Sequence, residues 1–205
     1  MTGPADSRAA RGPRAWADEL NTLDVAVYAA IAATPTPAMD TGLRRLSGAA
    51  NHSRLWLACS ALLAACGGER GRRAAENGLA SVALTSAVVN LVLKPLGNRR
   101  RPDRHVHDVP ITRHVAMPRS TSWPSGHSAS ASAFATGVGA AWPAAGIPLS
   151  VVASLVAYSR VHTGVHFPSD TIAGAASGVS LAPLAVAALE GRFRQPRRRR
   201  GSSAR

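Results

Sequence analysis

The stretch STSWPSGHSASASAFATGVGAAWPAAGIPLSVVASLVAY, residues 120–158, contains no Asp, Glu, Lys or Arg. It is much longer than the roughly 20 residues that one membrane-crossing helix requires. Trp142-Pro143 and residues 146–148, Gly-Ile-Pro, interrupt it, and proline and glycine at these positions favour a turn. The stretch therefore predicts two antiparallel membrane helices joined by a tight turn.

Four further apolar segments indicate additional helices: residues 22–33, 55–68, 77–93 and 171–189. The first contains Asp24 and runs into a Thr-Pro-Thr-Pro segment, so it predicts either a short membrane span or a helix in the membrane interface. Gly67-Gly68 predicts a helix end and residues 69–73 a basic loop. Gly174 and Gly178 have the spacing that lets two membrane helices approach closely. We expect an all-α fold, an integral-membrane helical bundle of about six transmembrane helices.

Charge is distributed unevenly along the chain. The 24 Lys and Arg residues exceed the 11 Asp and Glu residues and give a net charge of +13. Seven of the arginines lie in residues 192–205, which contain no acid. We expect an N-terminal cytoplasmic segment at 1–20, one membrane-embedded domain at 21–191, and a disordered, Arg-rich cytoplasmic tail at 192–205. Hydrophobic residues make up 46% of the chain, which excludes a disordered polar protein.

Three polar clusters lie at the ends of apolar segments: residues 94–102, 124–127 and 159–170. Charge beside the hydrocarbon core is costly and is commonly kept for function. Lys94, Arg101 and Arg160 are fixed cations that suit an anion, because a guanidinium donates two parallel hydrogen bonds to phosphate oxygens. Ser125 and Gly126 are expected at a helix start, where backbone N–H groups and the helix dipole attract a phosphoryl oxygen. The clusters together predict a phosphate-binding site.

Among the histidines, His166 has the clearest chemical context. It precedes Asp170 by four residues, so at the start of a helix the carboxylate can reach the imidazole and fix its tautomer. The same carboxylate would stabilise the cation that forms when the ring attacks as a nucleophile. His162 has no paired acid nearby in the sequence, and we assign it a structural role. His105, His107 and His114 lack an acid or cysteine that would complete a metal site and indicate a solvated loop.

Each cluster taken alone also has an ordinary interpretation. The basic run after Lys94 could anchor a span end by the positive-inside rule. Pro124–His127 could be a simple helix N-cap, and Arg160–His166 could be a loop beside anionic head groups. Only the joint occurrence of the three clusters in this order favours the functional interpretation.

Joint occurrence is also what makes the chain resemble the phosphatidic acid phosphatase type 2 superfamily. The signature of that family is K-x6-RP, PSGH and SR-x5-H-x3-D. Lys94 to Arg101-Pro102 matches the first part, residues 124–127 match the second letter for letter, and Ser159-Arg160 to His166 to Asp170 matches the third. The motifs extend from residue 94 to 170.

The resemblance implies a role for each matching residue. The third-motif histidine of the family attacks phosphorus and the aspartate supports it, which implies His166 and Asp170. The second-motif histidine protonates the leaving oxygen, which implies His127. The remaining positions bind phosphate in the family: Lys94, Arg101, Ser125, Gly126 and Arg160.

The expected function is that of a membrane lipid phosphate phosphatase. It would hydrolyse a phosphomonoester, or the terminal phosphate of a pyrophosphate, through a phosphohistidine and without a metal or cofactor. A lipid substrate follows from the position of the clusters at span ends. Polyprenyl pyrophosphates such as undecaprenyl pyrophosphate, polyprenyl phosphoribose, phosphatidate and phosphatidylglycerol phosphate all fit.

Two alternative functions stay open at this stage. The same pocket binds vanadate in haloperoxidases of the superfamily, although those are larger and soluble. The isoelectric point of about 11.6 and the arginine tail would also suit a protein that binds nucleic acid or an anionic surface. Positive-inside topology accounts for the charge of the tail, so no nucleic-acid partner is predicted.

The location of basic residues also predicts the topology in the cell membrane. The arginine tail and residues 69–73 are expected in the cytoplasm. One span separates each of them from a catalytic cluster, so the active site is expected on the extracytoplasmic face. Arg99 to Arg104 run against the rule on that face, and phosphate binding is the reason we assign for their presence there.

Overall fold

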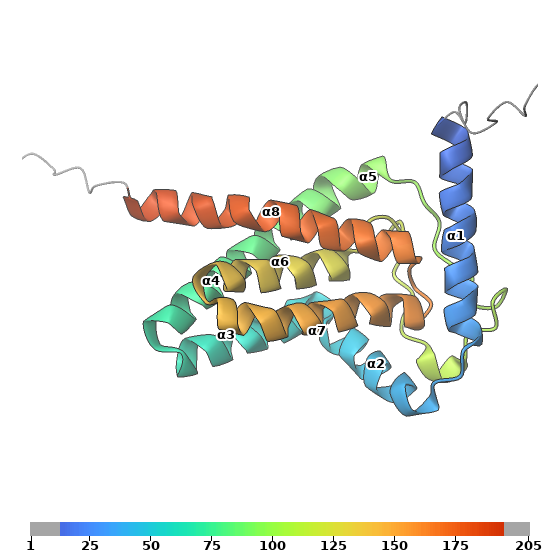
Figure 1. The fold of residues 1–205 in the computed structure, drawn as a ribbon, viewed down its shortest axis with the longest axis horizontal. Helices are drawn as coiled ribbons and strands as arrows, with labels where there is room; N and C mark the ends of the chain where they lie inside the picture. The colour runs from blue at the N-terminus through green and yellow to red at the C-terminus, as the bar shows by residue number, and fades with distance from the viewer. Residues whose placement is uncertain (1–12, 195–205) are drawn as a thin grey trace, which may run out of the picture.

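The computed structural model describes residues 13–194, and every regular element within them is helical (Figure 1). Three short non-α turns, η1 (Asn51–Ser53), η2 (Val89–Leu93) and η3 (Ile111–Arg113), lie among the α-helices. The α-helices are α1 (Pro13–Ala33), α2 (Pro37–Ala49), α3 (Arg54–Cys66), α4 (Gly68–Val88), α5 (Lys94–Leu96), α6 (Gly126–Ala141), α7 (Pro143–His162) and α8 (Pro168–Arg194).

Proline marks the start of four helices: Pro13 of α1, Pro37 of α2, Pro143 of α7 and Pro168 of α8. Proline suits this position because the first-turn N–H groups have no partner inside the helix and its φ is already helical. α6 begins instead with Ser125 as N-cap, whose Oγ accepts a hydrogen bond from the Ser128 N–H at 3.4 Å. The turn predicted at Trp142-Pro143 is confirmed, since it separates α6 from α7.

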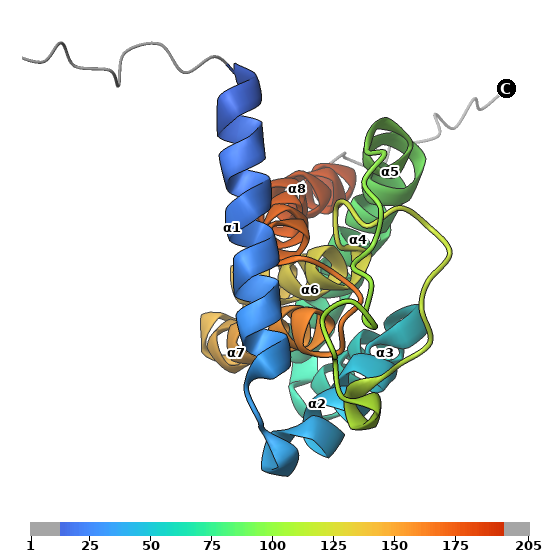
Figure 2. The same ribbon diagram turned by 90° about the vertical axis from the view of Figure 1, so that its right-hand side faces the viewer.

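Helix α6 forms the centre of the bundle and packs against α4, α7 and α8 (Figure 2). Its contact with α8 depends on two glycines. A Cβ at Gly174 would lie 2.3 Å from the Ser125 carbonyl oxygen, and one at Gly178 would lie 2.3 Å from that of Ala129. The close helix approach predicted from these glycines is confirmed, because no larger side chain fits there.

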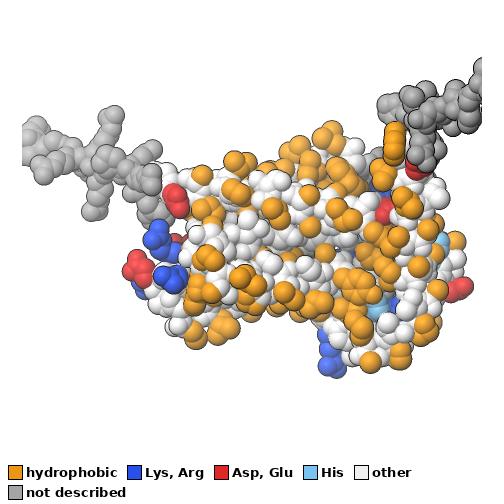
Figure 3. All heavy atoms as spheres, viewed as in Figure 1, with side chains coloured by type: hydrophobic (Ala, Val, Ile, Leu, Met, Phe, Trp, Pro, Cys, Tyr) orange, Lys and Arg blue, Asp and Glu red, His pale blue; other side chains and the backbone are white. Residues whose placement is uncertain are grey.

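Three described helical runs are long and apolar enough to cross a membrane: Gly68–Leu96, Pro143–His162 and Pro168–Gly191. The first joins α4, η2 and α5, while α3 packs against α4 and the 16-residue α6 lies between α4, α7 and α8. Figure 3 shows hydrophobic side chains along the bundle, with charged groups gathered toward its ends. The all-α membrane bundle is confirmed, and each apolar segment of the prediction corresponds to a helix.

The structure differs from the prediction in three segments. The interruption predicted at residues 146–148 is wrong, because these residues lie inside α7, which continues through Pro148. Residues 69–73 form the first turns of α4 and not a loop, because Gly68 adopts a φ of 56° and reverses the chain within one residue. Helix α2 is absent from the prediction, since it is not apolar throughout. Its buried side chains are Asp40, Leu43 and Ser47, whose spacing places them on one helical face.

Helix α1 runs across one end of the bundle and not along it (Figures 1 and 2). It contacts α7 and α8. Its exposed side includes a row of large apolar side chains, Trp16, Leu20, Leu23 and Val27. This arrangement favours the interfacial helix over the short span. Since α1 begins at Pro13 and α8 continues to Arg194, helices cross the boundaries expected at 20–21 and 191–192, while the tail from residue 195 onward lies outside the described residues.

Candidate active site

The three polar clusters meet at the end of the bundle that α1 and the loop between α5 and α6 cover (Figure 2). The helix directions explain this convergence, because α5 and α7 end there while α6 and α8 begin there. All eight site residues of the sequence prediction lie on these helix ends and their connections: Lys94, Arg101, Ser125, Gly126, His127, Arg160, His166 and Asp170.

His166 and Asp170 form a fully buried pair. The Nδ1 atom of His166 lies 3.5 Å from Asp170 Oδ2, and the two side chains are 2% and 0% exposed. Asp170 also accepts hydrogen bonds from the Phe167 N–H at 2.9 Å and from the Ser122 hydroxyl. The carboxylate is therefore held in place by several donors, and it orients the imidazole with its Nδ1 proton toward Asp170.

The other nitrogen of His166 faces a guanidinium group. Arg101 Nη1 lies 3.1 Å from His166 Nε2, and the same nitrogen donates to the Val165 carbonyl oxygen at 2.8 Å. Burial lowers the pKa of His166 to about 4, against the hydrogen bond to Asp170, which raises it; the charges of Arg101 and Arg160 lower it further. The ring is thus neutral at pH 7, with a lone pair on Nε2 beside a cation, which is the state that a nucleophile requires.

Further cations surround this lone pair. Lys94 Nζ donates to Ser120 Oγ at 3.0 Å and lies 3.8 Å from the point that a Cβ on Gly126 would occupy, so it stands over the start of α6. Arg160 is 2% exposed, and its Nη1 donates to Ser47 Oγ at 2.5 Å. Its buried Nε has no hydrogen-bond partner among the described residues. A buried donor without an acceptor is costly, so the arrangement suits a bound anion.

His127 lies at the same end, in the first turn of α6. Its Nε2 is 2.8 Å from Oδ1 of Asn51, and an amide oxygen only accepts, so Nε2 carries the proton. A histidine proton donor therefore lies beside the cluster of cations.

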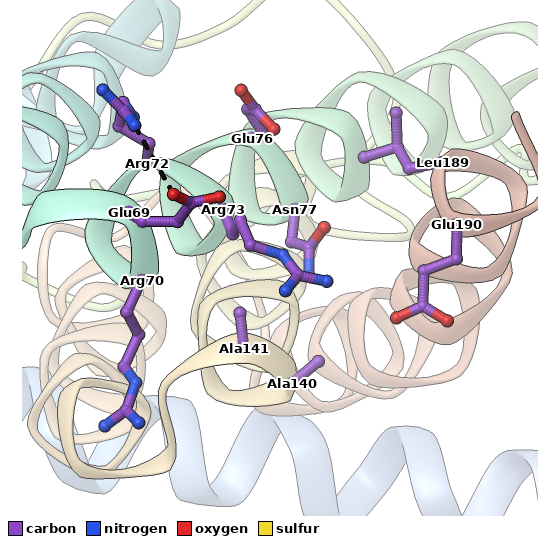
Figure 4. Close-up of a pocket in the computed structure, with 10 residues that line it drawn as sticks. All are labelled: Glu69, Arg70, Arg72, Arg73, Glu76, Asn77, Ala140, Ala141, Leu189 and Glu190. Carbon is purple, nitrogen blue, oxygen red and sulfur yellow. Dashed lines mark ion pairs between the residues drawn. The ribbon is translucent and has the colours of Figure 1, made fainter. Parts of the chain in front are cut away.

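A large cavity lies elsewhere, between α4, α6 and α8 at the opposite end of the bundle (Figure 4). It has a volume of about 920 Å³ and is lined by charges of both signs, including Arg73, Glu76 and Glu190. None of the motif residues lines it. Its size alone therefore does not connect it with the phosphate chemistry.

Comparison with protein families agrees with the geometry of the site. The model of the PAP2 superfamily matches residues 77–194, a range that contains all three motifs. The chain belongs to the PAP2 superfamily. Decaprenylphosphoryl-5-phosphoribose phosphatase of Mycobacterium tuberculosis is 35% identical over 178 residues, which cover 85% of this chain and 96% of that protein. Lipid A 1-phosphatase of Rhizobium etli is 35% identical over 104 residues, 48% of this chain and 43% of that protein.

Solved structures of PAP2 proteins share the fold. The transmembrane PAP2 type phosphatidylglycerolphosphate phosphatase of Bacillus subtilis is similar with a TM-score of 0.65 at 24% identity, covering 88% of this chain and 90% of that one. LpxE of Aquifex aeolicus has a TM-score of 0.65 at 23% identity, covering 80% and 95%. The relatives named here are phosphatases, so the haloperoxidase alternative is not favoured.

Residues outside the PAP2 signature complete the site, and the sequence analysis missed them. Arg99 Nη1 donates to Asp170 Oδ1 at 3.0 Å, and its Nη2 pairs with Asp24 Oδ2 at 2.6 Å. Asp24 also accepts from the Ser169 N–H at 2.8 Å, so α1 is tied to the start of α8. The acid inside an otherwise apolar segment was the one visible signal for this network. Arg99 itself is hidden in a run of three arginines.

The structural role of His162 stays a prediction, but the reason given for it, that no acid pairs with this histidine, is wrong. It does have a paired acid, because its Nε2 lies 3.0 Å from Oδ1 of Asp40 in α2. Asp40 also accepts from Arg113 Nε at 2.9 Å, and Arg113 donates to the Thr34 carbonyl oxygen at 2.7 Å. This buried network ties the end of α7, which carries Arg160, to α2.

Proposed function

We propose that this chain is a membrane lipid phosphate phosphatase that works through a phosphohistidine on His166. One observation carries the proposal: the neutral His166 ring has its Nδ1 toward Asp170 and its Nε2 3.1 Å from Arg101, inside a cluster of cations. That geometry presents a nucleophile to a group whose charge the cations neutralise. Phosphoryl transfer depends mainly on such positioning and electrostatic stabilisation.

The proposed reaction has two steps. In the first, His166 Nε2 attacks phosphorus, the bond from phosphorus to the leaving oxygen breaks, and His127 donates a proton to that oxygen. Asp170 stabilises the positive charge that the ring of His166 gains. In the second, His127 takes a proton from water, the water oxygen attacks phosphorus, and the bond from phosphorus to Nε2 breaks. Lys94, Arg101 and Arg160 stabilise the charge on the phosphoryl oxygens in both steps.

A lipid phosphate is the substrate class that best fits the position of the site. The site lies where the apolar length of the bundle ends, so a phosphate head group can reach it while the lipid chains stay in the bilayer. The relatives' names add support. Decaprenylphosphoryl-5-phosphoribose and phosphatidylglycerolphosphate are both lipids whose names contain two phosphate groups, and we propose a polyprenyl or glycerolipid substrate for this chain.

We also propose that the site faces away from the cytoplasm. Arg70, Arg72 and Arg73 lie at the opposite end of the bundle, around the start of α4, where the positive-inside rule places cytoplasmic residues. Two of the basic residues on the side of the site are explained by their contacts instead. Arg99 and Arg101 are engaged with Asp170 and His166.

A panel of lipids tests the proposal. Purified protein in detergent is assayed for phosphate release from a polyprenyl pyrophosphate, a polyprenylphosphoryl-5-phosphoribose, phosphatidate and phosphatidylglycerolphosphate, each with and without EDTA. We expect release from at least one lipid, its retention in EDTA because the cations supply the electrostatic stabilisation, and its loss in His166→Ala. Equal release by His166→Ala would refute the mechanism.

A further inference from the structure

A second cavity opens directly beside the proposed phosphate site. It has a volume of about 360 Å³ and is formed by the chain that follows α5 and by the loop before α6. Its polar lining comes from Asn98, Arg99, Arg100, Arg101, Arg119, Ser120 and Thr121. Neither histidine of the proposed mechanism lines it, and Arg101 is the one residue that it shares with that mechanism.

The Arg101 side chain lines the cavity and also contacts His166 of the proposed catalytic site. Its Nη1 points to His166, while its Nε donates to the Ser120 carbonyl oxygen at 2.9 Å and its Nη2 to that of Thr121 at 3.1 Å. Lys94 Nζ also donates to a residue of the cavity lining, Ser120, whose Oγ accepts at 3.0 Å. A group in the cavity would therefore lie next to a phosphoryl group bound at His166.

Arg100 and Arg119 give the cavity a positive charge that no acid among residues 13–194 balances. Both side chains are exposed, and neither makes a hydrogen bond or an ion pair within the described part of the chain. No Asp or Glu lines the cavity. Arg99, which also lines the cavity, differs from them because it is paired with Asp24 and Asp170. The large cavity at the other end of the bundle also contains acids beside its arginines.

We propose that this cavity is a second phosphate subsite, in which Arg100 and Arg119 bind a phosphate group that the enzyme does not remove. The inference rests on the proposed function and narrows it. The substrate is then a lipid with two phosphate groups on a short polar linker, such as a sugar or a glycerol. The linker is needed because the Arg101 side chain would lie between the two phosphate groups, whereas the phosphorus atoms of a pyrophosphate share one oxygen.

The test compares two lipids on the same variants. Arg100→Gln, Arg119→Gln and the double variant are assayed with phosphatidylglycerolphosphate or a polyprenylphosphoryl-5-phosphoribose, and in parallel with phosphatidate, which has one phosphate. For the double variant we expect KM for the two-phosphate lipid to rise about tenfold, the order that two exposed charge-assisted contacts supply, with kcat little changed. The KM for phosphatidate should change by no more than about twofold.

Arg72→Gln is the matched control, because it removes an exposed arginine at the opposite end of the bundle. It should leave the KM of both lipids unchanged. Equal rises of KM for both lipids, or no rise for either, would overturn the subsite, as would a parent enzyme that hydrolyses phosphatidate but no two-phosphate lipid. A parent enzyme that releases phosphate from no lipid would refute the proposed function itself, so the two failures are distinguishable.

Discussion

Replacing Arg99 should move the loss of activity at low pH to a higher pH. Arg99 donates to Asp170 Oδ1 at 3.0 Å, and the other oxygen of that carboxylate lies 3.5 Å from His166 Nδ1. The guanidinium also lies over the Phe167 ring, 4.3 Å from its centroid. A cation on Asp170 weakens the stabilisation that this carboxylate offers to protonated His166. Arg99→Gln removes the cation, so the pKa of His166 should rise.

The geometry sets the size of this rise. Through the Asp170 carboxylate, Arg99 lies roughly 7 Å from the His166 ring, and two unit charges at that distance interact by about 2.4 kcal/mol at an effective dielectric constant of about 20. That energy corresponds to about 1.7 pK units. The Arg99 side chain is 23% exposed and also pairs with Asp24, and both effects reduce its influence. We expect a rise of about one unit, from about 4 to about 5.

The assay is kcat/KM for one lipid phosphate between pH 4.5 and pH 8. In the proposed mechanism neutral His166 is the nucleophile, so activity is lost as the pH falls through its pKa, and a raised pKa moves that loss to higher pH. The ratio of variant to parent should fall about threefold from pH 8 to pH 4.5, and ionisation of the substrate cancels in this ratio. Arg99→Lys should restore the parental profile. Arg100→Gln removes the neighbouring arginine, which does not contact Asp170. It should leave the acid limb of the pH profile, the fall of kcat/KM at low pH, unchanged.

A constant ratio across this pH range would refute the reasoning, because a purely structural role of Arg99 lowers activity equally at every pH. Asp24→Asn supplies a check in the opposite direction. It leaves Arg99 with Asp170 as its remaining carboxylate. The acid limb should then stay or move to lower pH, and an upward shift would contradict the electrostatic account. Intrinsic tryptophan fluorescence at each pH monitors whether the variants stay folded.

Three further predictions concern the acid, the helix packing and the topology. His127→Ala should lose about 10²–10⁴ of the rate with a lipid phosphate, whose alkoxide leaving group needs a proton, but far less with p-nitrophenyl phosphate; equal losses would exclude a general acid. Gly178→Leu should destabilise the fold by about 1–3 kcal/mol or more, because its Cβ would lie 2.3 Å from a backbone oxygen of α6, whereas Gly191→Leu meets nothing within 4 Å; thermal unfolding in detergent compares the two. In a cysteine-free background, Val106→Cys should react with an impermeant thiol reagent in intact cells and Arg72→Cys should not; the reverse pattern would invert the topology.

The sequence alone predicts a large part of the fold. Runs of uncharged residues need no partner to be recognised, because a membrane helix satisfies its own backbone hydrogen bonds and its side chains face lipid. Turns and close helix contacts that depend on proline or glycine can also be predicted from the sequence, as Trp142-Pro143 and the glycines of α8 show. Helix α2, which the sequence did not predict, is amphipathic. Its buried face can be recognised only in the folded structure, where Arg113 and His162 contact Asp40.

The sequence by itself thus determined the membrane bundle, the three motifs and the identity of the candidate nucleophile, since these depend on composition and on spacing within single segments. Only the tertiary structure decided which charges meet. It selected Arg99, from three adjacent arginines, as the partner of Asp24 and Asp170, and it left Arg100 without a counter-charge within residues 13–194. The physical reason is distance: electrostatic pairing acts over a few ångströms in space, and these partners are separated by some 70 residues or more along the chain.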